Sequence, residues 1–151
     1  MMKSHTDWKM EELLNQEQRN FSGHLAIIFC YLQEKGLSVD DFVEYTGAKA
    51  SSRWKSAVTN LKDMFNSVLF NVLSNGEKVI NVNFEENDAV ATVTGLFKSD
   101  IMQYYGCIPE IYDRFWNKFK LIAGEVGFSF SWEKTEEGYY KIRLRAMDLK
   151  K

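Results

Sequence analysis

Cys107 is the residue whose surroundings best fit nucleophilic chemistry. It lies in the segment YYGCIPE, directly ahead of a helix that we expect to begin at Pro109. The positive end of a helix dipole lowers the pKa of a nearby thiol, and the thiolate is the reactive form of cysteine. Glu110 follows in sequence, but a cysteine nucleophile also needs a base, and neither histidine is close along the chain. The alternative, which we favour, is that Cys107 is a small buried hydrophobic side chain.

His24 is a candidate heme or metal ligand. It lies at the edge of an apolar helix face, four residues before Ile28, and the other histidine is His5. Metal sites need several Cys, His or carboxylate ligands at suitable spacing, and no such cluster occurs in the sequence. We therefore predict no metal and no cofactor, and expect His24 to be a half-buried, hydrogen-bonded side chain.

Four pairs of adjacent acidic residues are candidates for acid–base chemistry. Neighbouring side chains point about 100° apart on a helix and to opposite faces on a strand, so adjacent carboxylates do not converge on one proton. We interpret all four pairs as solvated surface. They are Glu11/Glu12, Asp40/Asp41, Glu85/Glu86 and Glu136/Glu137.

Aromatic residues make up 15% of the chain and gather between residues 104 and 119. This segment holds more rings than one helix face can bury. Tyrosine and tryptophan are favoured where an apolar body needs a polar tip, as in ligand pockets and interfaces. Two interpretations stay open: a core packed on a sheet, or a pocket or dimer surface. The predicted ligand-binding residues are Trp54, Tyr104, Tyr105, Cys107, Tyr112 and Trp116.

Helical periodicity dominates the first half of the chain. It predicts a helix over 7–20, which continues or restarts in a second helix ending at Gly36, and a short helix over 38–47. The run 51–75 should form one long central helix, capped near Ser51, on which the core packs. Its apolar positions, spaced 4-3-4-3-4, are Trp54, Val58, Leu61, Phe65, Val68 and Val72.

Alternation with a period of two follows the long helical run. Residues 78–84 and 89–95 are rich in β-branched side chains and flank the turn-forming sequence EEND. This arrangement predicts a β-hairpin. In its first strand, we expect Ile80, Val82 and Phe84 to share one face.

A second hairpin is predicted from residues 128–133 and 139–146, which flank the turn KTEEG. Between the hairpins, Ser99 can cap a short helix and Pro109 suits the first position of another. Helices followed by strands favour an α+β fold. We expect N-terminal helices and the long central helix to pack on a four-stranded antiparallel sheet made of two hairpins, in a single domain over residues 1–151.

Charge argues against nucleic acid as a partner. The net charge is −2, and basic and acidic residues are balanced in both halves of the chain. Nucleic-acid binding is driven by a basic surface that neutralises phosphates. The best local excess is Lys141, Arg143 and Arg145, with Lys150 and Lys151 at the end.

The sequence also indicates the cellular compartment of the protein. Its two cysteines form no CxxC pair, no secretory signal pattern is visible, and no apolar run approaches the roughly 18 residues of a membrane span. We expect a soluble cytoplasmic protein with no membrane partner.

The order of helices and hairpins resembles the ligand-binding superfamily of 4-vinyl-reductase domains, heme-based nitric-oxide sensor domains and TRAPP-type trafficking subunits. These proteins place helices before and between two β-hairpins, and the resemblance covers most of the chain. The Tyr-x-Ser-x-Arg signature of the heme sensors is absent, and residues 128–146 lack the cysteines of 4-vinyl-reductase hairpins. The resemblance implies a fold of this kind and carries no function by itself.

Our first functional expectation is a non-enzymatic sensor or interaction domain that binds a small apolar ligand or a protein partner, as a homodimer. Any pocket should lie between the central helix, residues 104–119 and the sheet. The alternatives are a small hydrolase-like enzyme that uses Cys107 or a carboxylate, and a helix-turn-helix regulator that uses residues 25–62.

Overall fold

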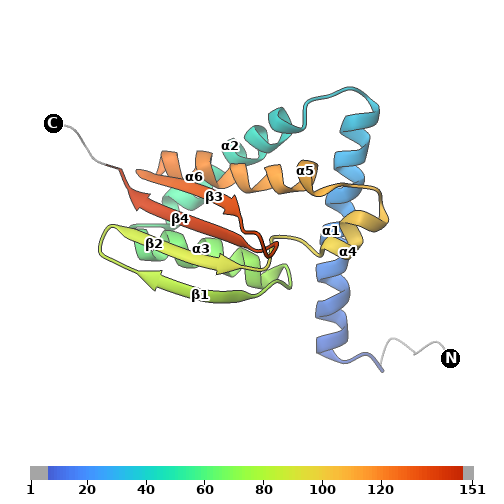
Figure 1. The fold of residues 1–151 in the computed structure, drawn as a ribbon, viewed down its shortest axis with the longest axis horizontal. Coiled ribbons are helices and arrows are strands. Elements are labelled where there is room, and N and C mark those ends of the chain that lie inside the picture. The colour runs from blue at the N-terminus through green and yellow to red at the C-terminus, as the bar shows by residue number, and fades with distance from the viewer. Residues whose placement is uncertain (1–6, 148–151) are drawn as a thin grey trace.

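The computed structural model describes residues 7–147 (Figure 1). The histidine at position 5 and the lysines at 150 and 151 lie outside the described residues. In chain order, the elements are α1 (Met10–Glu34), α2 (Val39–Ala57), α3 (Leu61–Ser74), β1 (Val79–Phe84), β2 (Asp88–Val93), α4 (Ser99–Tyr104), α5 (Pro109–Tyr112), a 3-10 helix (Asp113–Asn117), α6 (Lys118–Glu125), β3 (Phe128–Lys134) and β4 (Tyr140–Ala146).

The four strands form one antiparallel sheet in the order β1-β2-β4-β3, built from two hairpins whose second strands lie side by side. Helices α3 and α6 cover one face of the sheet, and α2 packs against α6 (Figure 1). The predicted α+β fold with a four-stranded antiparallel sheet is confirmed.

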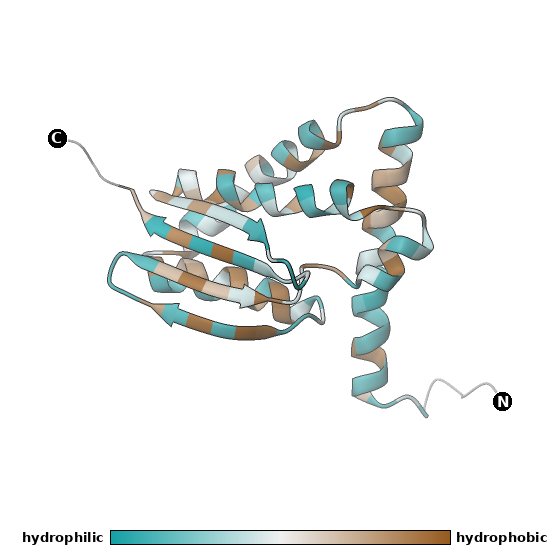
Figure 2. Cartoon of the chain, viewed as in Figure 1, coloured by the Kyte–Doolittle hydropathy of each residue, from teal (hydrophilic) through white to brown (hydrophobic). Residues whose placement is uncertain are grey.

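The hydrophobic core lies between the central strands and the helices. Alternate residues of β2 and β4 point into it, and Ala89 and Ala91 have no exposed surface. Small residues at these positions let the helix layer approach the sheet closely. Figure 2 shows the resulting alternation of apolar and polar residues along the strands.

The long helix predicted over residues 51–75 is wrong: the chain leaves the helix at Val58 and begins α3 at Leu61. Val58 is extended, with φ −107° and ψ 126°. The side chain of Asn60 accepts a hydrogen bond from the backbone N–H of Asp63 at 2.8 Å, which caps α3. A β-branched residue followed by a strong capping residue thus interrupts the helix, although the apolar spacing continues across the break.

The helix predicted over residues 38–47 instead continues to Ala57 as α2. Gly47 therefore lies inside α2 and does not end it. It is glycine because α6 approaches closely: a Cβ atom at this position would lie 2.9 Å from the carbonyl oxygen of Lys118. Ser51, expected to begin a helix, donates its hydroxyl hydrogen to the carbonyl of Gly47 at 2.7 Å. Gly47 thus permits the close contact between α2 and α6, and the Ser51 hydrogen bond lies within α2.

One further prediction needs correction, and another is confirmed only in part. The helix expected from Pro109 is divided into α5, the 3-10 helix and α6. In β1, Val82 and Phe84 share one face as predicted, because they pair with the buried Ala91 and Ala89 of β2, although both are partly exposed on this edge strand. Ile80 lies in a β-bulge and is exposed as well.

Replacing Asn60 by Ala should lower the free energy of unfolding by about 1 kcal/mol, because the first turn of α3 loses its side-chain cap. Urea denaturation would measure the change. Asn15→Ala, at an exposed position inside α1, is the matched control and should stay within roughly 0.5 kcal/mol of the wild type. Equal effects of the two substitutions would contradict a capping role for Asn60.

Candidate functional site

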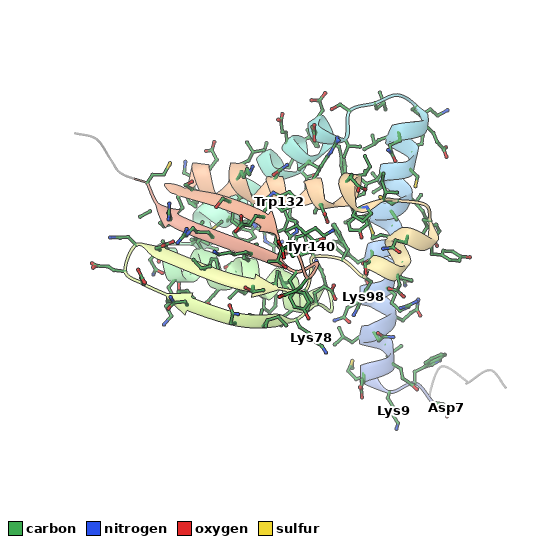
Figure 3. The ribbon with its side chains drawn as sticks, viewed as in Figure 1. Asp7, Lys9, Lys78, Lys98, Trp132 and Tyr140 are labelled. Atoms are coloured by element: carbon green, nitrogen blue, oxygen red, sulfur yellow. The ribbon has the colours of Figure 1, made fainter. Side chains whose placement is uncertain are left out.

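A crevice of about 220 Å³ opens at one end of the sheet. The loop after β2, helices α4 and α5 with the 3-10 helix, and the β3–β4 turn converge around it. Figure 3 shows Tyr140 and Lys98 at this end of the sheet. The aromatic and charged residues of its lining are Phe97, Tyr112, Trp116, Tyr140, Glu77, Asp113 and Lys134.

Asp113 is the buried centre of a charged cluster on one side of the crevice. Its Oδ1 accepts a hydrogen bond from the hydroxyl of Tyr140, and its Oδ2 accepts one from the ammonium of Lys134 at 3.3 Å. Lys134 and Tyr140 are directly opposite each other on β3 and β4, so the register of the hairpin assembles the cluster. Burial, and then the hydrogen bond to Asp113, raise the pKa of Tyr140, which keeps its hydroxyl a donor.

Glu77 lies between α3 and β1 and forms part of the lining. Its Oε2 is 3.9 Å from the ammonium of Lys98, which donates a shorter hydrogen bond of 2.7 Å to the carbonyl of Gly76. Burial raises the pKa of Glu77, and the Lys98 charge opposes that shift. A Cβ atom at Gly95 would lie 2.9 Å from the other carboxylate oxygen, so glycine leaves room for this side chain.

The six predicted ligand-binding residues do not form one pocket. Tyr112 and Trp116 line the crevice. Trp54 lines an open groove of about 630 Å³ between α2 and α3. Tyr104 and Tyr105 line a hollow of about 460 Å³ between α1 and α4. The expected aromatic pocket is therefore divided among three places.

Cys107, the sixth predicted residue, is fully buried. Burial raises the pKa of its thiol to about 12, and the nearby Cys30 adds to the shift. A cysteine nucleophile needs a lowered pKa and access to substrate. The structure gives Cys107 neither property.

His24 is exposed and lines the hollow between α1 and α4. It is not the half-buried side chain that we expected. Among residues 7–147, no three His, Cys, Asp or Glu side chains are grouped so that they could hold a metal ion.

Helix α1 carries a second apolar stripe in addition to its buried face. It packs mainly on α4, and its N-terminal half extends past β1 (Figure 1). Figure 2 shows apolar bands on this extension. The large exposed apolar residues of α1 are Met10, Leu13, Leu14, Phe21, Ile27, Ile28 and Tyr31.

Sequence reasoning missed the charged residues of the crevice. Asp113 carried a usable signal, because it is an acidic residue among Tyr112, Phe115 and Trp116, where an apolar surface is expected. Glu77 follows a glycine in a turn and gave no signal, because only the tertiary fold brings it to the crevice.

Lys118 at the start of α6 was also missed. Its ammonium lies 4.3 Å from the ring centre of Phe115 and 4.9 Å from that of Phe119. Burial lowers its pKa from 10.5 to about 8. The aromatic faces stabilise the charge that burial disfavours.

In comparisons with known proteins, no family model and no curated protein matches this chain. Within residues 7–147, no helix combines the length and the apolar character needed to cross a bilayer. The crevice and the α1 stripe are thus the features from which a function can be argued.

Replacing Lys118 by Met should change how stability depends on pH. The folded protein holds the Lys118 proton less tightly than the unfolded chain does. Between pH 8 and pH 10.5, roughly, unfolding therefore takes up a proton, and the free energy of unfolding of the wild type rises with pH. Urea denaturation at several pH values should show the wild type gaining on the order of 1 kcal/mol relative to Lys118→Met across this window.

Lys120→Met, at an exposed position of the same helix, is the control. Its free energy of unfolding should depend on pH in the same way as that of the wild type. A constant difference between wild type and Lys118→Met from pH 7 to 10 would show that folding does not change the proton affinity of Lys118.

Proposed function

We propose that this protein is a non-enzymatic interaction domain that forms a homodimer through α1. The observation that carries the proposal is the exposed apolar stripe on this helix. Large contiguous apolar patches on a monomer mark interaction sites, and an extended helix gains most of its stability from packing.

The spacing of the stripe is that of a helix pair. Leu14, Phe21 and Ile28 are seven residues apart, and a second row runs through Glu17 and His24 three residues after the first. Two such rows form the seam by which one helix packs against another.

The stripe is also complementary to itself, which favours a second copy of this chain as the partner. Antiparallel pairing about a two-fold axis between residues 20 and 21 sets apolar residues together in three pairs and a carboxylate against an imidazole in a fourth, while Phe21 lies opposite the partner's Asn20. It also places opposite ends of the two helix dipoles together. The pairs would be Met10 with the partner's Tyr31, Leu13 with the partner's Ile28, Leu14 with the partner's Ile27, and Glu17 with the partner's His24.

The area available suits a stable dimer. The exposed parts of the large apolar side chains on α1 amount to roughly 600 Å², given about 150–250 Å² for a large side chain. Tyr104 is 82% exposed and, with Tyr105, borders the same face of α1, which brings the area to roughly 800 Å². A standard interface buries about 800 Å² on each partner.

The alternatives have less support. A cysteine enzyme needs a reactive Cys107, and this thiol is buried with a raised pKa. A helix-turn-helix needs a turn between residues 47 and 51, where α2 is continuous. Arg143 and Arg145, part of the best basic segment, both contact the carboxylate of Asp88, at 3.0 and 3.6 Å.

Replacing Leu14 by Glu should convert a dimer into a monomer, because it places a charge in the seam. Sedimentation equilibrium at micromolar concentrations would measure the mass. Leu73→Glu is the matched control: Leu73 is 52% exposed on α3, Leu14 is 54% exposed on α1, and the Leu73 variant should stay dimeric. A monomeric wild type, or a dimeric Leu14→Glu variant, would refute the proposal.

Cysteine crosslinking would test the orientation of the helices. In a Cys30→Ser background, which removes the half-buried native thiol next to Tyr31, Asn20→Cys beside the proposed axis should form an intermolecular disulfide on mild oxidation. Met10→Cys should not, because antiparallel helices hold the two copies of residue 10 far apart. The reverse pattern would indicate parallel helices.

A further inference from the structure

We propose that the crevice at the end of the sheet binds a small organic ammonium ion, with the Glu77 carboxylate as its anchor. The proposal concerns a different surface from α1 and does not depend on the dimer.

Glu77 has unused capacity to accept hydrogen bonds. Within residues 7–147, no donor lies within hydrogen-bond distance of its carboxylate, and its one ion pair, to Lys98, is 3.9 Å long. Lys98 instead directs its ammonium to the carbonyl of Gly76 at 2.7 Å. A partly buried carboxylate without a donor gains most from a ligand that brings N–H groups and a positive charge.

The other charges of the crevice have partners already. Asp113 accepts hydrogen bonds from both Tyr140 and Lys134. Lys134 in the lining donates to Asp113, and Lys98, which is not a lining residue, donates to the carbonyl of Gly76, so neither ammonium is available to an incoming anion without breaking a contact. This difference favours a cationic ligand over an anionic one.

Aromatic rings form the walls against which the body of the ligand would pack. Phe97 and Tyr112 are in edge-to-face contact at 6.5 Å between ring centres, and Trp116 lies 5.7 Å from Tyr140. Aromatic faces attract organic cations and supply apolar contact at the same time. The ligand should therefore carry an apolar group next to its ammonium.

The volume sets the size of the ligand. The crevice holds about 220 Å³, below the roughly 300–1,000 Å³ of sites for drug-sized molecules and equal to about seven water molecules. A monoamine with one small ring or a short chain fits this space, whereas a nucleotide or a peptide does not.

The test compares benzylamine, benzyl alcohol and benzoate, which share a ring and differ in charge. Heteronuclear NMR titrations should show benzylamine shifting the signals of Tyr112 and Trp116, with an affinity about tenfold or more above that of either analogue. Equal or tighter binding of the alcohol or of benzoate would overturn the ammonium assignment. An absence of shifts at these two residues with all three probes would overturn the site itself.

The residue assignment is tested by Glu77→Gln, which keeps the shape of the side chain and removes its charge. It should lower the affinity for benzylamine about tenfold and leave that for benzyl alcohol unchanged. Glu137→Gln, an exposed acid in the β3–β4 turn, removes the same charge near the crevice and should change neither affinity. An unchanged benzylamine affinity in Glu77→Gln would overturn the role of Glu77. If that variant did not fold, the preference of the wild type among the three probes would still decide the ligand class.

Discussion

The close approach of α2 to α6 at Gly47 is the constraint on which the arrangement of the helices depends. Because the backbone of Lys118 occupies the space that a side chain at this position would take, α6 is held between α2 and the sheet. The turn before it is wound as a 3-10 helix, which buries Asp113, Phe115 and Trp116. The close contact at Gly47 therefore lies directly after the segment that contributes Asp113 and Trp116 to the crevice.

The sequence was most informative where structure depends on neighbouring residues. Both hairpins were predicted because strand alternation and turn residues are local signals, and the sheet that they form is the one observed. The break at Val58 was missed because Leu61 resumes the same apolar spacing after a short interruption. Gly47 was interpreted as a helix end because its actual role, contact with α6, depends on a residue some 70 positions away.

The candidate sites show the same division between local and distant signals. The aromatic excess around residues 104–119 was visible, but the pattern could not say which rings would be buried. Tyr112 and Trp116 entered the core at the edge of the crevice, while Tyr104 stayed on the surface. Glu77 and Asp113 are 36 positions apart in the sequence, and no pattern within either segment predicts that they line one crevice. Charge pairing across the fold can be found only from the structure.

The bulge in β1 has a consequence for how copies of this protein can meet. An edge strand offers backbone N–H and C=O groups with which a strand of another molecule can pair, and this pairing begins the growth of aggregates. In β1 the register shifts between Val79 and Asn81, and the ammonium of Lys62 lies 5.8 Å from the ring centre of Phe84 farther along the strand. A regular incoming strand would meet an irregular ladder with a charge near its far end. Sheet extension at this edge is thereby hindered.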